Sequence, residues 1–203
     1  MPKVGGGEAR RAQVKRAALE ILAERGFADL PVKDIARRAG VSTGVLYHYF
    51  SSKDEILLEA LGIAFREADE VLRGRVAARP PGHRLPTYLQ AAATMACEHP
   101  EAARALLAAV GQAQASDEVR ARLAALFASF RAYAQDLLQQ EVGGARDGAA
   151  ALIVAAGIGL ACQWAADPDA VNLPASGDVL QSLLAASPAA ADPSPAGRPE
   201  EVK

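Results

Sequence analysis

Residues 31–50 read PVKDIARRAGVSTGVLYHYF, and this stretch contains two short helical patterns separated by a glycine. A proline is tolerated in the first turn of a helix, and after Pro31 the apolar residues recur at helical spacing until Gly40 interrupts them. A hydroxyl side chain at position 42 or 43 can cap a second helix that runs to about Phe50. Two short helices joined by a tight, glycine-containing turn predict a helix-turn-helix.

The second helix of this hairpin leaves Thr43, Gly44, Val45, Tyr47 and His48 projecting away from its apolar contact. Hydroxyl, methyl, phenol and imidazole groups suit the base edges and phosphates of a DNA major groove. Helical hairpins with a central glycine also occur as plain packing units, so the spacing alone leaves both interpretations open.

The composition favours an all-α protein around this hairpin. The 203 residues are 51% apolar, 23% charged and 5% aromatic, and long stretches rich in Ala, Leu, Arg and Glu run without proline. Two cysteines, Cys97 and Cys162, exclude a disulfide framework and are interpreted as reduced core thiols. Residues 1–20 have no apolar signal-peptide core, so we expect a cytoplasmic protein.

Breakers and caps divide the chain into about nine expected helices and four regions. The helices are expected near residues 8–25, 31–39, 43–50, 53–77, 86–98, 100–114, 116–142, 146–166 and 176–186. The regions are a flexible Gly-rich leader (1–7), a helix-turn-helix domain (8–60), a larger helical domain (61–186) and a disordered tail rich in Pro, Ala and Ser (187–203).

Charge is distributed unevenly between these regions. Residues 1–53 hold ten basic and five acidic side chains, whereas the rest of the chain is net acidic. The asymmetry suggests that the N-terminal part meets a polyanion, and Arg10 and Arg11 are candidates for an arm that reaches phosphates.

The stretch 149–166 is nearly uncharged and long enough to cross a bilayer. It is built of Ala and Gly rather than Leu and Phe, contains Gln163 and has no flanking basic cluster, so we interpret it as a buried helix in a core or a subunit interface.

The segment from Arg16 to Leu57 resembles the N-terminal domain of the tetracycline-repressor (TetR) family of bacterial transcription regulators. The matching residues are Ala17-Ala18, Gly26-Phe27, Asp34-Ile35-Ala36, Ala39-Gly40-Val41-Ser42, Gly44, Leu46-Tyr47, Tyr49-Phe50, Ser52-Lys53 and Leu57. Farther on, Gly159-Leu160 through Asp167-Pro168 is similar to the penultimate helix of many members.

This resemblance implies a homodimer that presents its third helix to successive major grooves of a near-palindromic double-stranded DNA operator. The implied DNA-binding residues are Ser42, Thr43, Gly44, Val45, Tyr47, His48, Tyr49 and the phosphate-binding Lys53. Leu30 departs from the pattern, because many members have at that position a Ser or Thr that caps the second helix and contacts a phosphate.

The resemblance also implies a ligand cavity in the C-terminal domain and a dimer interface formed by residues 146–166 and 176–186, in which Gly157, Gly159 and Ala161 allow close helix approach. Candidate cavity residues are Tyr88, Met95, Arg104, Gln112, Phe127, Phe130, Tyr133, Gln163 and Trp164.

The expected function is therefore that of a homodimeric repressor released from its operator by a small-molecule effector of unknown identity. The alternatives are an effector-independent regulator or activator, and a helical small-molecule-binding or interaction protein with a non-functional helix-turn-helix. We expect no enzyme activity, catalytic residue, metal, cofactor or membrane partner, since none of the three histidines lies in a catalytic or metal motif.

Overall fold

Nine α-helices and no strand form the regular structure of residues 5–25, 31–114, 116–143 and 147–185, which are the residues that the computed structural model describes. The all-α prediction is confirmed. The helices are α1 (Gly5–Arg25), α2 (Val32–Arg38), α3 (Thr43–Tyr49), α4 (Lys53–Ala77), α5 (Arg84–Glu98), α6 (Pro100–Gln112), α7 (Asp117–Val142), α8 (Ala149–Ala166) and α9 (Leu173–Ala185).

Three helices begin earlier than the sequence predicts. Helix α1 begins at Gly5, so residues 5–7 of the expected leader are helical. Helix α5 begins at Arg84 because a proline in the first turn removes only an N–H that has no helical partner. Helix α9 begins at Leu173 because the Asn172 side chain caps it, accepting a hydrogen bond from the Ala175 N–H at 3.1 Å.

Some expectations lie outside the described residues. These are the rest of the leader (1–4), the position of Leu30, residue 146 of the expected interface, and Ala186 with the tail 187–203.

The helix-turn-helix has the form that its sequence predicts. Gly40 adopts φ +61°, a left-handed conformation that favours glycine, and the chain turns between α2 and α3 there. The Ser42 side chain then caps α3 by accepting a hydrogen bond from the Val45 N–H at 3.2 Å. Leu46 and Phe50 are buried with Ile35 of α2 in one apolar core.

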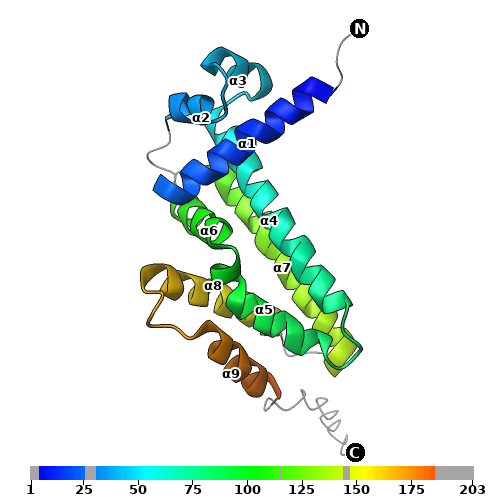
Figure 1. The fold of residues 1–203 in the computed structure, drawn as a ribbon. Coiled ribbons are helices and arrows are strands. Elements are labelled where there is room, and N and C mark those ends of the chain that lie inside the picture. Colours follow the sequence, from blue (N-terminus) through cyan, green and yellow to red (C-terminus); the bar gives the residue numbers. More distant parts are fainter. Residues whose placement is uncertain (1–4, 26–30, 115, 144–146, 186–203) are drawn as a thin grey trace, which may run out of the picture.

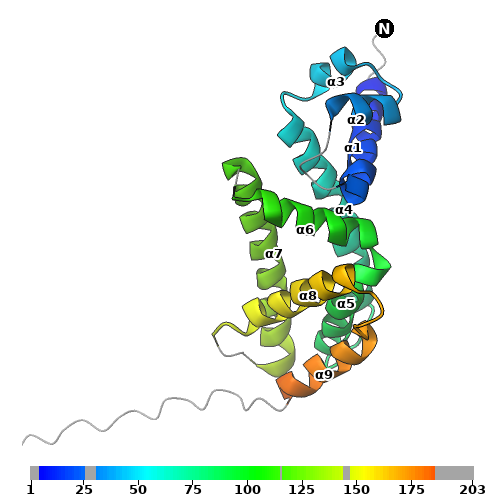
Figure 2. The ribbon, with the colours of Figure 1, turned by 90° about the vertical axis from the view of Figure 1, so that its left-hand side faces the viewer.

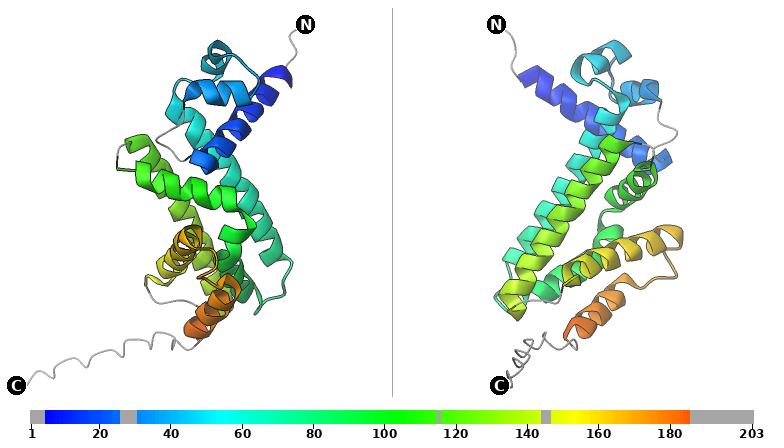
Figure 3. Two further views of the ribbon diagram at one scale, coloured as in Figure 1. Left: turned by 60° about the vertical axis from the view of Figure 1, so that its left-hand side comes forward. Right: turned by 180° about the vertical axis from the view of Figure 1, so that it is seen from behind.

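Helices α1–α3 form one end of the molecule, α8 and α9 the other, and α4 and α7 run side by side between them (Figures 1 and 3). Helix α6 lies beneath α1, and α5 packs against both α8 and α9 (Figure 2). One apolar cluster joins α1–α4 with α6 and the start of α7, and a second joins the end of α4 with α5, α7 and α8. The expected domain boundary at residue 60 therefore falls inside α4, which continues through it unbroken.

Substitutions at the neighbouring residues Leu46 and Tyr47 should distinguish a side chain that stabilises the fold from one that only forms the surface. Leu46 is fully buried, so Leu46→Ala should lower the free energy of unfolding by about 2–5 kcal/mol through lost contacts and a residual cavity. Tyr47 is 52% exposed, so Tyr47→Ala should change the free energy of unfolding by less than about 0.5 kcal/mol. Urea denaturation followed by circular dichroism measures both, and an equal loss in the two variants would show that Tyr47 belongs to the core.

Candidate DNA interface and effector cavity

Helix α3 presents its polar side outward while its apolar side is anchored in the core. Ser42, Gly44, Tyr47 and His48 are exposed, and Thr43 and Val45 are half-buried. The exposed set offers hydroxyl, phenol and imidazole groups on one short helix, which is the chemistry that can contact bases and phosphates. Their roles in DNA binding stay predictions.

Tyr49 is half-buried, and it links α3 to α1. The Arg11 side chain donates a hydrogen bond from Nη1 to the Tyr49 carbonyl at 2.9 Å, and the guanidinium lies 4.7 Å from the centre of the Phe50 ring. The Tyr49 ring packs edge-on against His48, with 5.1 Å between ring centres. These contacts give Tyr49 a structural role, in addition to the DNA contact that the sequence predicts.

Lys53 is the first residue of α4 and lies beside the hairpin. Ser52 caps this helix by accepting a hydrogen bond from the Glu55 N–H at 3.0 Å. The Glu55 carboxylate accepts two hydrogen bonds from the side chain and N–H of Ser51, each 2.6 Å long, and these lower its pKa. Lys53 thus adds its charge to the positive end of a well-capped helix, a place that favours phosphate.

Most of the N-terminal basic residues pair with acids inside the fold. Arg11, Lys15, Arg16, Arg25, Arg37 and Arg38 each form an ion pair with a carboxylate of α1, α2 or α4. Arg10, Lys33 and Lys53 form none within the described part of the chain. The expectation that Arg11 belongs to an arm is wrong, because Arg11 is held by Glu59 and the Tyr49 carbonyl.

Glu59 of α4 is the centre of this network, since it pairs with both Arg11 and Lys15 of α1. Burial acts to raise the pKa of Glu59, but hydrogen bonds from Lys15 and Arg11 outweigh it, so the pKa is lowered. Through Arg11 the same network reaches the last residue of α3. Helix α4 is therefore connected electrostatically to the helix that carries the candidate DNA contacts.

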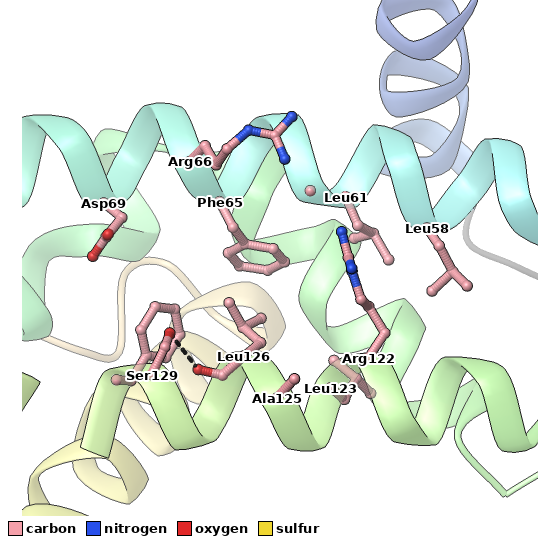
Figure 4. A pocket seen from close by; sticks show the side chains of 12 residues that line it. Leu58, Leu61, Phe65, Arg66, Asp69, Arg122, Leu123, Ala125, Leu126 and Ser129 are labelled. Carbon is pink, nitrogen blue, oxygen red and sulfur yellow. Dashed lines mark hydrogen bonds between the residues drawn. The ribbon is translucent and has the colours of Figure 1, made fainter. Parts of the chain in front are cut away.

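Two adjoining cavities lie farther along α4. The outer one, of about 230 Å³, lies between α4 and α7 and is shown in Figure 4, with the Phe65 ring between the two helices and the Asp69 carboxylate directed toward α7. The inner one, of about 100 Å³, is enclosed by α4–α8 and is mainly apolar. Phe65, Asp69 and Phe130 line both, so the two cavities share a wall.

Three of the nine expected cavity residues line these cavities: Tyr88, Met95 and Phe130. Burial raises the pKa of Tyr88 to about 12, so its phenol stays neutral. The other six do not line them. Phe127 packs against the apolar cluster that α1–α4 share with α6, and Trp164 packs against a small cluster of α5, α6, α8 and α9. Tyr133 contacts Arg73 and Tyr88. Arg104 and Gln163 are exposed, and Gln112 lies near the end of α6.

Residues of α4 that the sequence did not predict as cavity residues form much of the cavity wall. Phe65, Asp69 and Leu72 follow one another at i, i+4 and i+7, so they share a face of the helix. In the sequence, the acidic residue within this apolar stripe indicates that the helix face contacts something other than the apolar core.

Helices α8 and α9 leave an apolar face uncovered in the single chain. Only Ala150, Ile153 and Ala161 of α8 are buried, so α8 is not buried in the core of a single chain, and its burial in a subunit interface stays a prediction. The side chains of Leu152, Val179 and Leu183 are 71%, 57% and 65% exposed. By length and composition alone, α8 could also cross a membrane.

The small residues of α8 act within the chain. Gly157 lies against α5, where a Cβ atom would come within 3.2 Å of the Ala92 carbonyl oxygen, and Ala161 is buried against α5 and α6. At Gly159, no atom of the described part of the chain lies within 4 Å of the corresponding position. Gly157 and Ala161 thus allow close helix approach within the chain, and their use between two subunits stays a prediction.

Cys97 and Cys162 are both exposed, so their interpretation as core thiols is wrong. The Cys97 thiol donates to the Thr94 carbonyl in its own helix, and Cys162 lies on the outer side of α8.

Comparisons with known proteins agree with this geometry. Residues 14–60 match the family described as bacterial regulatory proteins, tetR family. The chain is 33% identical over 129 residues to the HTH-type transcriptional regulator BetI of Rhizobium meliloti, an alignment that covers 63% of each protein. The chain thus spans less than two thirds of the length of this curated relative.

Solved structures match over most of the chain. A putative transcriptional regulator from Pseudomonas aeruginosa is 25% identical, with a TM-score of 0.74 over 88% of this chain and 92% of its own. A putative transcriptional regulator from Saccharomonospora viridis in complex with choline has a TM-score of 0.78 at 17% identity, over 88% and 97% of the two chains. FadR of Bacillus subtilis in complex with stearoyl-CoA has a TM-score of 0.70 at 20% identity, over 86% and 97%.

The Glu59 network should contribute stability that depends on pH. Because its folded-state pKa lies below the ordinary 4.5, the contribution is present above that value and is lost as the pH falls through the folded value. Glu59→Gln should cost about 1 kcal/mol of unfolding free energy at pH 7 and little at pH 3.

Glu67→Gln is the matched control, because Glu67 pairs with α1 only through the exposed Arg16. Denaturant titrations at both pH values should give this control a smaller loss at pH 7. A Glu59→Gln deficit that is equally large at both pH values would contradict the assignment.

Proposed function

We propose that this chain, whose residues 14–60 match the tetR family of bacterial regulatory proteins, is a cytoplasmic, homodimeric repressor of that family that a small-molecule effector releases from a palindromic operator. The observation that carries the proposal is the exposed polar face of α3, with Tyr47 and His48 outward while Leu46 and Phe50 are held in the core. Tyr47 is a large aromatic side chain that stays 52% exposed beside the fully buried Leu46, which supports a contact with a partner such as DNA.

The apolar face of α8 and α9 is the proposed dimer interface. Leu152, Val179 and Leu183 are large, exposed and close to the buried residues by which these helices pack on α5. Burying the same face on both copies satisfies a two-fold symmetric interface, and we propose a second copy rather than lipid as its partner. Two α3 helices on one dimer would then meet two half-sites of one operator.

The cavities beside α4 are the proposed effector site. They lie on the helix that begins with Lys53 and that is tied to α1 by Glu59. A ligand that shifts α4 changes the placement of α3 in each subunit, and this would alter the spacing of the two recognition helices. One similar structure contains choline and another stearoyl-CoA, so the fold accommodates ligands of different chemistry.

Fluorescence anisotropy with duplexes tiled across the DNA upstream of the protein's own gene tests the proposal. One duplex should bind roughly 10³–10⁷ times more tightly than a scrambled control, with two chains per palindrome. Tyr47→Ala should remove most of this preference. Binding that is absent for every duplex at low salt would exclude DNA recognition and leave a helical small-molecule-binding protein.

Lys53→Ala should weaken binding about equally for all duplexes and reduce the slope of log affinity against log salt by roughly one unit, because one phosphate contact is lost. Arg131→Ala is the control, since it removes one exposed positive charge from α7. An unchanged slope in Lys53→Ala would remove this residue from the phosphate contacts.

Leu152→Arg should convert the dimer to a monomer by placing a charge in the proposed interface, and affinity for a palindrome should fall with it. Light scattering coupled to size exclusion measures the mass. Val71→Arg, at a 43% exposed position of α4 outside this face, should remain dimeric. A dimeric Leu152→Arg protein would place the interface elsewhere.

A further inference from the structure

Asp69 carries an unused hydrogen-bond acceptor inside the protein. Its Oδ1 atom is buried and has no hydrogen-bond partner among the described residues, whereas Oδ2 accepts from Arg73 Nε at 2.6 Å. The Arg73 guanidinium is also stacked on the Tyr133 ring, 4.0 Å from its centre, so it is held on one side of the carboxylate. A buried acceptor without a donor is costly, and this one favours a ligand that supplies the donor.

The surroundings of Asp69 favour a positive ligand. Among the residues that the structure describes, Asp69 is the only charged one that lines the inner cavity. The same wall contains the rings of Phe65, Tyr88 and Phe130 and the sulfur of Met95. Aromatic ring faces attract cations, and the attraction is stronger where water is excluded.

The two cavities together suit a ligand with a charged end and an apolar body. The edge-to-face pair Phe65 and Phe130, with 6.3 Å between ring centres, lies on the wall that both cavities share, and Asp69 lies on the same wall. Figure 4 shows Phe65 and Asp69 in the outer cavity. An ammonium group at Asp69 can therefore direct its apolar body into either chamber.

The outer chamber also contains basic groups, and these suggest a competing ligand class. The Arg66 and Arg122 side chains approach the same point above Gly62, where a carboxylate could bind. Both arginines also line a wide groove of about 670 Å³, whose other charged lining residues are Lys15, Glu55, Glu59 and Glu118. Glu55 and Glu59 already pair with basic residues of α1, and Asp69 pairs with Arg73, so net charge does not separate the two ligand classes. What separates them is the Oδ1 atom of Asp69, which is buried and has no hydrogen-bond donor among the described residues.

We propose that the effector is a small organic cation, a protonated amine that donates an N–H to Asp69 Oδ1 and places its apolar body among the aromatic rings. The proposal rests on the proposed function, because it gives the chemical class of that effector. The charged hydrogen bond positions the amine, and the rings stabilise its charge and bury its carbon skeleton.

Three probes with one carbon skeleton test the charge preference on the full chain: phenylbutylamine, phenylbutanol and phenylbutyrate. Isothermal titration calorimetry at pH 7 should show the amine binding at least about tenfold more tightly than the neutral alcohol, and the carboxylate binding most weakly. This comparison needs no variant, so it does not depend on the folding of any mutant. Equal affinities, or tightest binding of phenylbutyrate, would overturn the proposal.

Variants test whether the preference for the amine arises at Asp69 and the aromatic rings. Asp69→Asn should reduce amine affinity about tenfold and leave that of the alcohol within about twofold. Glu70→Gln is the matched control, because Glu70 is the next acid on α4, is exposed and does not line either cavity. Phe130→Leu, which keeps an apolar side chain, should weaken the amine severalfold more than the alcohol. Retained amine preference in a folded Asp69→Asn protein would overturn the site.

The operator duplex, measured with the same protein, keeps the two proposals apart. Specific DNA binding without amine preference overturns only the ligand class. Amine preference without specific DNA binding supports the cation site and overturns the repressor.

Discussion

Helix α4 is the element on which the rest of the structure depends, because both main apolar clusters pack on it. Ile56 and Leu57 belong to the cluster shared with α1–α3, and Leu72 and Val76 belong to the cluster shared with α5, α7 and α8. With 25 residues the helix is about 37 Å long, and its continuous hydrogen bonding makes it stiff. The proposed effector cavities and Lys53 therefore lie on one continuous helix, with no break between them.

The ion pairs of the N-terminal helices reduce the positive charge that the N-terminal part can offer to DNA. Ten basic residues suggest a strongly positive surface, yet six of them are paired with carboxylates. Their main effect is to hold α1, α2 and α4 in register, with Glu59 and Arg11 as the most connected pair. The candidate contacts to DNA then come from a few side chains, such as Tyr47 and Lys53, rather than from a broad basic surface.

The uncovered face of α8 and α9 and the vacant oxygen of Asp69 share one physical feature. Each lacks a partner among the described residues of the single chain: the apolar face is exposed, and the polar oxygen is buried without a hydrogen-bond donor. Apolar surface gains free energy when a partner covers it, and a buried carboxylate oxygen gains when a donor reaches it. The exposed apolar face therefore suits contact with a second chain, and the buried oxygen suits contact with a ligand.

The sequence by itself determined the helix-turn-helix, because Gly40, Ser42, Leu46 and Phe50 act over a few residues through a turn, a cap and one helical period. It also indicated most helix ends, since caps such as Ser52 and Ser116 are local. Only the tertiary structure decided that Arg11 reaches Glu59, 48 residues away, and that Asp69 faces a cavity while Gln163 does not. Periodicity defines the faces of a helix, but what each face meets depends on how distant helices pack around it.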